Sequence, residues 1–292
     1  MLRMPNLPQL ALIGHGAWGS NHARVMRELG VLRWVYDENH EALQGCPERT
    51  SFIDKIWDDE RVQGVVIATP PATHADLAIT SLRAGKHALV EKPMAMNELD
   101  CVRMNIEAQA MNRVLMVGHL MRFHDGYHGL LEDAGNAGRI EYAYSHRLQP
   151  GRVRADMSCL WSLAPHDVDM LIGLLGVPMS VACAPGMTRQ PGLVDIVMAT
   201  LEWASGARGH IFISWAHPAK QRELTVIGEY GACIMNQESA DEPLKAELLH
   251  FMGRMEGCEP LPGTTPVDGF NVVRVLAACD DSMRQGGQRV CL

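Results

Sequence analysis

The stretch that decides the fold is QLALIGHGAWG, residues 9–19. The apolar run from Gln9 to Ile13 is typical of a buried strand, and the apolar residues of 20–29 have helical spacing. The glycines between them complete the pattern G-x-G-x-x-G, which in a strand–turn–helix context is the dinucleotide-binding fingerprint. Its glycines allow a tight turn, close approach of a pyrophosphate, and packing of helix on strand. The pattern predicts a cofactor site at Gly14, Gly16, Ala17, Trp18 and Gly19.

Outward from this stretch, strands and helices alternate as far as residue 118. We expect strands at 32–36, 65–68, 87–90 and 114–117, and helices at 75–83 and 99–112. Such an alternation, with right-handed crossovers, predicts an α/β fold with a doubly wound parallel sheet. We therefore predict an N-terminal Rossmann domain over residues 1–118.

Beyond residue 118 the pattern changes. One clear helix is expected at 165–175, and it is followed by extended runs at 181–184, 194–203, 209–215 and 223–227 before a last helix at 272–284. Consecutive strands without intervening helices indicate an antiparallel sheet. We predict that residues 119–292 form a C-terminal α+β domain with a large, mostly antiparallel sheet.

Composition narrows the class of protein. The chain has 292 residues, 47% of them hydrophobic, and a formal net charge of −8. An acidic chain has no field that attracts nucleic acid or anionic membrane, so neither is expected as a partner. No run approaches the ~20 apolar residues that span a bilayer, and we expect a cytoplasmic protein. The eight cysteines have no C-x-x-C spacing, which favours reduced thiols and no metal centre.

Asp37 indicates which dinucleotide is bound. It ends the second expected strand, 23 residues after Gly14. A carboxylate there hydrogen-bonds the adenosine ribose hydroxyls and repels a 2′-phosphate. The next residues, Glu38, Asn39 and His40, supply no fixed cation to offset that repulsion. The sequence therefore predicts NAD as the cofactor.

Two further segments carry groups that can move a proton. Glu91-Lys92-Pro93 follows the expected strand 87–90, and ligands bind at the carboxyl ends of parallel strands. A lysine there can stabilise a developing alkoxide or pass a proton, although spacing alone equally allows a surface lysine. His166 and Asp169 are three apart, on one face of the helix at 165–175. The residues alone favour a structural histidine at this helix start.

These motifs together resemble those of the Gfo/Idh/MocA oxidoreductase family. The resemblance rests on the glycine pattern, Asp37, Thr69-Pro70 followed by His74, Glu91-Lys92-Pro93, Gly118-His119 before Arg122-Phe123-His124, and the helix with His166 and Asp169. It implies that Lys92 and His166 are the catalytic pair. It also implies cofactor contacts for Thr69, Pro70, His74, Glu91 and Lys92, and substrate contacts for His119, Arg122, Trp161 and Asp169. Many members carry an aspartate where this chain has Ser162.

A narrower resemblance concerns the substrate. The segments 147–154, 161–167 and 210–228 are similar to those of the branch that acts on UDP-N-acetylglucosaminuronic acid at C3. This implies that Arg152 and Arg154 hold a diphosphate or carboxylate, whereas the residues alone equally allow a solvated basic loop.

The leading hypothesis is an NAD-dependent dehydrogenase of a nucleotide sugar at C3. The cleft between the two domains would bring Lys92 and His166 together, and the second domain would form a homo-oligomer, a dimer or tetramer. A ketosugar, inositol or aminoglycoside-sugar reductase or dehydrogenase is the first alternative. A catalytically silent, cofactor-bound regulator is the second, and retention of both Lys92 and His166 argues against it.

Overall fold

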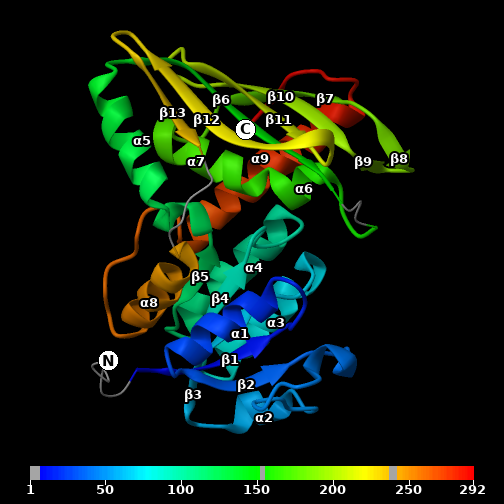
Figure 1. Cartoon of the computed structure of the whole chain (residues 1–292), viewed down its shortest axis with the longest axis vertical. Helices are drawn as coiled ribbons and strands as arrows, with labels where there is room; N and C mark the ends of the chain where they lie inside the picture. The colour runs from blue at the N-terminus through cyan, green and yellow to red at the C-terminus, as the bar shows by residue number, and fades with distance from the viewer. Residues whose placement is uncertain (1–6, 152–154, 237–241) are drawn as a thin grey trace. The chain divides into compact units, whose positions relative to one another are not determined.

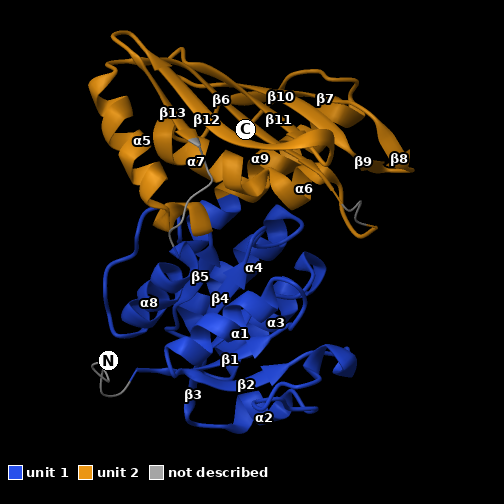
Figure 2. Ribbon diagram, in the orientation of Figure 1, with its two compact units in different colours: residues 1–119, 242–270 blue, residues 120–241, 271–292 orange. Residues whose placement is uncertain are grey.

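The computed structural model describes residues 7–151, 155–236 and 242–292. The chain divides into two compact units (Figure 2). Unit 1 comprises residues 1–119 and 242–270, and unit 2 comprises residues 120–241 and 271–292. Among the described helices, none combines the length and the apolar character that crossing a membrane requires. All eight cysteines are free thiols in this structure.

Unit 1 is built on a five-stranded sheet with the order β2-β1-β3-β4-β5, all parallel. Its strands are β1 (Gln9–Ile13), β2 (Leu32–Tyr36), β3 (Val62–Ile67), β4 (His87–Glu91) and β5 (Leu115–Gly118). Residues 10–13 of β1 are at most 1% exposed, as a central strand covered on both faces requires. The strand order reverses between β1 and β3. Ligands bind at such a switch point, outside the carboxyl ends of the strands.

The helices of unit 1 connect or cover these strands. They are α1 (Gly19–Glu28), α2 (Asp54–Asp58), α3 (His74–Arg83), α4 (Glu98–Ala110) and α8 (Pro243–Met255), with 3-10 turns η1 (His40–Leu43) and η2 (Pro71–Thr73). The expected parallel Rossmann-type sheet is confirmed, and the ends of its elements differ from the predicted ones by at most three residues.

The sequence assigned all residues after 118 to the second domain, but α8 returns to unit 1. Its apolar face packs on the parallel sheet. A side chain at Gly64 of β3 would lie 3.1 Å from Leu10 and 3.2 Å from both Phe251 and Met255 of α8. Burial of this helix face is the physical reason for the different division, because spacing does not tell which sheet a helix covers.

Unit 2 contains a seven-stranded sheet with the order β13-β12-β6-β11-β10-β7-β14. Its strands are β6 (Ile140–Pro150), β7 (Ser180–Pro185), β10 (Ile196–Glu202), β11 (Arg208–Ser214), β12 (Ala216–Gly228), β13 (Ala232–Asn236) and β14 (Val290–Cys291), and β8 (Thr188–Gln190) pairs with β9 (Leu193–Val194) in a separate ribbon. Only β6 and β11 pair in parallel among these described strands. The expected mostly antiparallel sheet is confirmed.

Helices α6 (Cys159–Leu163), α7 (Pro165–Leu175) and α9 (Pro266–Arg284) lie on one face of this sheet, and α5 (Asp125–Asn136) contacts β12 and β13 (Figure 1). A 3-10 turn, η3 (Leu120–Phe123), precedes α5, and α9 begins in unit 1. The α7 bounds are those that the sequence predicts. Pro165 suits the first turn, and Gly176, with φ +80°, ends the helix.

Candidate active site

The glycine turn after β1 has the geometry that its pattern predicts. Gly14 has φ +95°, and a Cβ there would lie 2.6 Å from the backbone oxygen of Ala68, the residue that follows β3. A Cβ at Gly19 would collide with the carbonyl of Gly14. A side chain at Gly16, in contrast, would meet no described atom within 4 Å. The two outer glycines are required by packing, and the middle one leaves the backbone open to a ligand.

The start of α1 is suited to an anion. The described residues supply no hydrogen-bond acceptor to the backbone N–H groups of Gly16, Ala17 and Trp18. Unsatisfied N–H groups at a helix N-terminus, together with the helix dipole, bind phosphate groups. The residues present therefore fit the pyrophosphate of a dinucleotide.

Asp37 lies beside this turn. Its Oδ2 accepts a hydrogen bond from the His15 N–H at 2.6 Å, and its Oδ1 accepts one from the Asn39 N–H at 2.8 Å. Each carboxylate oxygen retains a second lone pair for a ribose hydroxyl. The turn and the carboxylate are thus fixed to each other, as a site for the adenosine ribose of NAD requires.

His74, at the start of α3, is fully buried. Its Nε2 lies 2.9 Å from the Thr69 carbonyl oxygen and its Nδ1 lies 3.0 Å from the Pro93 carbonyl oxygen. Burial lowers the pKa of His74. The ring ties the turn after β3, which contains Thr69 and Pro70, to the turn after β4. The structure therefore gives His74 a supporting position for both turns.

Glu91, the last residue of β4, was predicted as a cofactor contact, but its side chain turns toward α1. Its Oε1 accepts a hydrogen bond from the Trp18 indole and lies 2.8 Å from Nε2 of His22, and its Oε2 accepts one from the Lys92 N–H at 3.2 Å. Burial by itself raises the pKa of Glu91, but the hydrogen bond and charge of His22, with Lys92 and Trp18, outweigh it and hold the pKa below its ordinary value. Glu91 fixes the end of β4 to the glycine-turn helix.

Lys92 is the first residue after β4, and its side chain is half-buried. The following Pro93, Met94 and Ala95 are buried, so the turn that carries the lysine is anchored on both sides. Lys92 therefore lies at the edge of the sheet where the strand order predicts ligands to bind.

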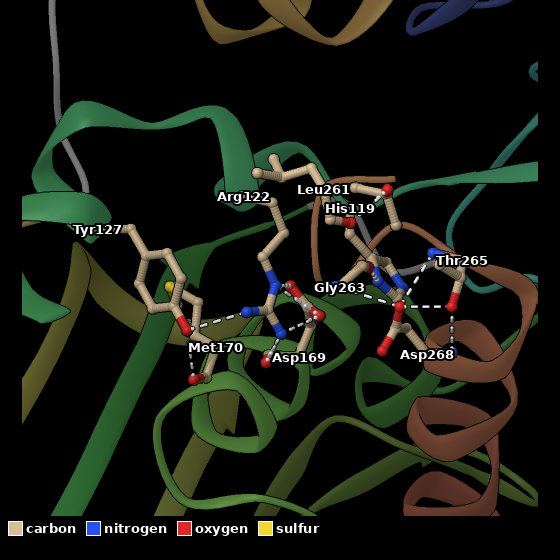
Figure 3. A network of polar contacts seen from close by, with 10 residues as sticks. His119, Arg122, Tyr127, Asp169, Met170, Leu261, Gly263, Thr265 and Asp268 are labelled. Atoms are coloured by element: carbon tan, nitrogen blue, oxygen red, sulfur yellow. Dashed lines mark hydrogen bonds and ion pairs between the residues drawn. The ribbon is translucent and has the colours of Figure 1, made fainter. Parts of the chain in front are cut away.

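His119, predicted as a substrate contact, is the last residue of this part of unit 1 and is 1% exposed. Its Nδ1 lies 2.6 Å from the carbonyl oxygen of Gly263 (Figure 3). Asp268 organises the same loop by accepting hydrogen bonds from the N–H groups of Gly263 and Thr265, at 3.1 and 3.0 Å. His119 is thus held against the loop that leads into α9.

Arg122 and Asp169 were both predicted to contact substrate, and in unit 2 they bind each other. The guanidinium donates from Nε to Oδ2 of Asp169 at 2.9 Å and from Nη2 to Oδ1 at 2.7 Å (Figure 3). It also donates to the Tyr127 hydroxyl at 3.2 Å. Both members of the pair are nearly fully buried. The pair fixes α7 to the segment η3, one helical turn from His166.

His166 is half-buried in the first turn of α7. Its neighbour Asp167 is fully buried and pairs with Nε of Arg147 at 2.5 Å, while also accepting from Ser145 Oγ at 2.5 Å. Both acids beside the histidine are therefore in ion pairs with arginines. Arg147 and Ser145 were missed as partners because a spacing rule does not show which side chains of β6 face a helix.

Trp161, also predicted as a substrate contact, is 6% exposed, and its indole donates to Oδ2 of Asp280 at 2.6 Å. Burial raises the pKa of Asp280. This hydrogen bond joins α6 to α9. The N–H is the only polar group of the indole, and its partner is a residue of unit 2. Arg152 and Arg154, the predicted anion clamp, lie outside the described residues.

Comparison with known proteins agrees with this geometry. A family model described as an oxidoreductase family with an NAD-binding Rossmann fold matches residues 9–119. The model of the GFO/IDH/MocA C-terminal domain matches residues 130–234. Together the two models cover more than half of the chain.

Individual relatives span most of the chain. The UDP-N-acetylglucosamine 3-dehydrogenase of Acidithiobacillus ferrooxidans is 29% identical over 260 residues, 86% of this chain and 79% of that protein. The scyllo-inositol 2-dehydrogenase (NAD(+)) of Bacillus subtilis is 26% identical over 226 residues, 73% of this chain and 62% of that protein.

Among solved structures, the WlbA dehydrogenase from Bordetella pertussis in complex with NADH and UDP-GlcNAcA has a TM-score of 0.86 and 24% identity, over 98% of this chain and 99% of that one. This likeness shows the same fold. The family model with an NAD-binding Rossmann fold confirms the expected class and cofactor. The chain belongs to the Gfo/Idh/MocA family of NAD-dependent oxidoreductases that act on CH–OH groups.

Proposed function

We propose that the chain transfers a hydride between NAD and C3 of a nucleotide sugar, with Lys92 and His166 handling the proton of the reacting hydroxyl. NAD supplies the hydride acceptor or donor. The observation that carries the proposal is the anchoring of Lys92 at the carboxyl end of β4, where Glu91 and His74 fix the turn on either side.

The roles of the two proposed catalytic residues follow from their chemistry. A lysine amine that accepts the hydroxyl proton favours the developing alkoxide, and a histidine is the side chain best suited to exchange protons near neutral pH. The pairing of Asp167 with Arg147 and of Asp169 with Arg122 supports this role for His166, because both pairs fix the helix that carries it.

The substrate class rests on a relative named as a UDP-N-acetylglucosamine 3-dehydrogenase. The most direct test is a panel of UDP- and dTDP-sugars with inositols as comparison compounds, assayed in both directions at the absorbance band of reduced nicotinamide. Turnover of a UDP-sugar with oxidation at C3 is the expected result. Turnover of inositols alone would mean that the substrate is a polyol and not a nucleotide sugar. Absence of turnover with every compound of the panel would contradict the proposed substrate class.

Arg152 and Arg154 supply a second test of the substrate. If each holds an anionic group, Arg152→Ala and Arg154→Ala raise KM more than they lower kcat. The reason is that such a contact stabilises the bound substrate and the transition state equally. Each charge-assisted contact is worth ~1.5–3 kcal/mol. Arg208→Ala, which removes an exposed arginine of β11, is the matched control. An unchanged KM in both test variants means that the two arginines belong to a solvated loop.

A further inference from the structure

Three buried ionisable groups meet behind the turn that carries Lys92. They are His22 of α1, Glu91 of β4 and Glu247 of α8, and all three are at most 7% exposed. One nitrogen of His22 and one carboxylate oxygen of each glutamate all lie within 4.8 Å of one another. All three elements belong to unit 1. A cluster of this kind at the core of a sheet is costly unless its charges are matched.

Glu247 is the member without an evident partner. It is fully buried, and neither carboxylate oxygen has a hydrogen-bond partner among the described residues. Burial and the neighbouring charge of Glu91 raise the pKa of Glu247 well above its ordinary value, whereas the pKa of Glu91 lies below its own. The opposite directions favour a proton on Glu247 and the negative charge on Glu91.

The surrounding charged groups agree with this distribution. Glu91 receives His22 and Trp18 on one oxygen and the N–H of Lys92 on the other. Nε2 of His22 faces Glu91 at 2.8 Å, and Nδ1 of His22 has no partner among the described residues. Arg24 and Glu242 are also charged and lie close to each other where α1 meets α8, but both side chains are about half exposed. The remaining basic residues of α8 are Lys245, His250 and Arg254.

The same three residue types could in principle hold a metal ion, but the distances favour hydrogen bonding. Ligand atoms about 2.0–2.2 Å from a tetrahedrally bound ion lie about 3.3–3.6 Å apart. Nε2 of His22 and Oε1 of Glu91 are only 2.8 Å apart, and this oxygen also accepts from Trp18. The cluster therefore has the geometry of a polar network.

We propose that His22 and Glu247 are positioning residues for Lys92, and that they do so by holding the Glu91 side chain against the Lys92 N–H. Glu247 in its neutral form fills the space beside Glu91 without adding a second negative charge. His22 donates to the oxygen of Glu91 that faces α1, which leaves the other oxygen for the Lys92 peptide. This inference rests on the proposed role of Lys92 in proton transfer.

The test compares Glu247→Ala, Glu247→Gln and Glu91→Gln in the full chain with NAD and a sugar that is turned over. We expect Glu247→Ala to lower kcat about 10- to 100-fold through displacement of the lysine, with KM and NAD affinity close to the parent. Glu247→Gln, an isostere of the neutral acid, restores most of kcat and leaves the pH profile in place. Glu91→Gln moves the acidic limb of the kcat profile to lower pH, because removal of a carboxylate makes the ammonium form of Lys92 less favourable.

A measurement that needs no substrate accompanies the kinetics. At neutral pH the infrared spectrum of the parent contains the carbonyl band of a buried carboxylic acid, and Glu247→Gln removes it. Glu256→Gln, an exposed glutamate at the end of the same helix, leaves that band and kcat unchanged. Melting temperature and NAD binding of each variant verify that it is folded.

Three results overturn the inference. They are parental kcat in Glu247→Ala, a pH profile of Glu247→Gln that moves like that of Glu91→Gln, and a stoichiometric metal ion that is lost from Glu247→Gln. Lys92→Ala is included in the series to separate the two claims. If that variant turns over normally, the role of Lys92 fails, whereas the infrared band still reports whether Glu247 is neutral.

Discussion

Asp37 shows how a single side chain can serve a turn and a ligand together. Its carboxylate already accepts hydrogen bonds from the N–H groups of His15 and Asn39, which orient it beside the glycine turn. The remaining lone pairs are available to ribose hydroxyls, and the negative charge opposes a 2′-phosphate. The two carboxylate oxygens of Asp37 therefore determine both the cofactor preference and the local stability of the turn.

We predict that Asp37→Ser combined with Glu38→Arg reduces the preference for NAD over NADP, because the repulsive carboxylate is replaced by a cation. The variant also loses up to two backbone hydrogen bonds, each worth about 0.5–1.5 kcal/mol of folding stability. Fluorescence titration with both dinucleotides measures the preference, and Glu38→Arg alone is the control. Tighter binding of NADP than NAD by the parent would remove the basis for this prediction.

The glycine turn could be predicted from the sequence because each of its members has a local requirement. Gly14 needs a positive φ, and Gly19 needs the absence of a Cβ. The direction of the Glu91 side chain could not be predicted. It depends on His22 and Trp18, which lie 69 and 73 residues away in the chain and reach Glu91 only through the packing of α1 on the sheet.

At the scale of elements, α7 carries His166, and two buried ion pairs hold this helix in place. Arg122 binds Asp169 from one side, and the guanidinium passes so close to the helix that only glycine fits at position 173. A Cβ there would collide with Nη1 of Arg122 and with the hydroxyl of Tyr127. Glycine in a helix interior otherwise lowers stability, so its place here reflects the close approach of the arginine.

Gly173→Ala is expected to destabilise the protein by about 1–3 kcal/mol, because overpacking outweighs the better helix propensity of alanine. Gly129→Ala is the matched control, since a Cβ at this position of α5 meets no described atom within 4 Å. The control should raise the urea midpoint slightly while Gly173→Ala lowers it. Equal shifts in the two variants would show that the guanidinium does not constrain α7.

The sequence predicted α7 well because proline and glycine mark its two ends. It did not predict α8, although the buried residues Leu244, Leu248, Phe251 and Met252 have helical spacing. Nor did it predict β6, in which the buried positions alternate but include Ser145 and Arg147. Ser145 and Arg147 interrupt the alternation of apolar residues by which a half-buried strand is usually recognised. Both side chains can be buried because they bind Asp167 of α7, which lies far from them in the sequence.

At the scale of the whole molecule, the sheet of unit 2 carries a row of rings on β6 and β11. The Tyr144 and His210 rings stack with centroids 5.0 Å apart, and Tyr142 accompanies them at 5.7 Å from His210. On the neighbouring β10, Met198 is 54% exposed. Aromatic side chains and methionine are enriched where a protein surface is covered by another chain.

We therefore expect the homo-oligomer that the family resemblance implies, and light scattering on the purified protein measures it directly. Met198→Glu places a charge in this surface and should shift the mass toward the monomer. Met187→Glu, at another exposed methionine of unit 2, is the control. A monomeric parent at micromolar concentration would contradict the expectation.

The central claim is that Lys92 and His166 handle one hydroxyl proton, while the glycine turn and Asp37 hold the pyrophosphate and ribose of NAD. Kinetics of Lys92→Ala, His166→Ala and the double variant test it most directly, with NAD affinity measured on the same samples by fluorescence. We predict that each single change lowers kcat by a factor of ~10²–10⁴. The double variant should be little worse than the poorer single one, because both residues serve one proton path. NAD affinity should stay near that of the parent. Near-normal turnover in Lys92→Ala would contradict the account, and near-normal turnover in His166→Ala alone would leave Lys92 as the only proton-transferring residue of the pair.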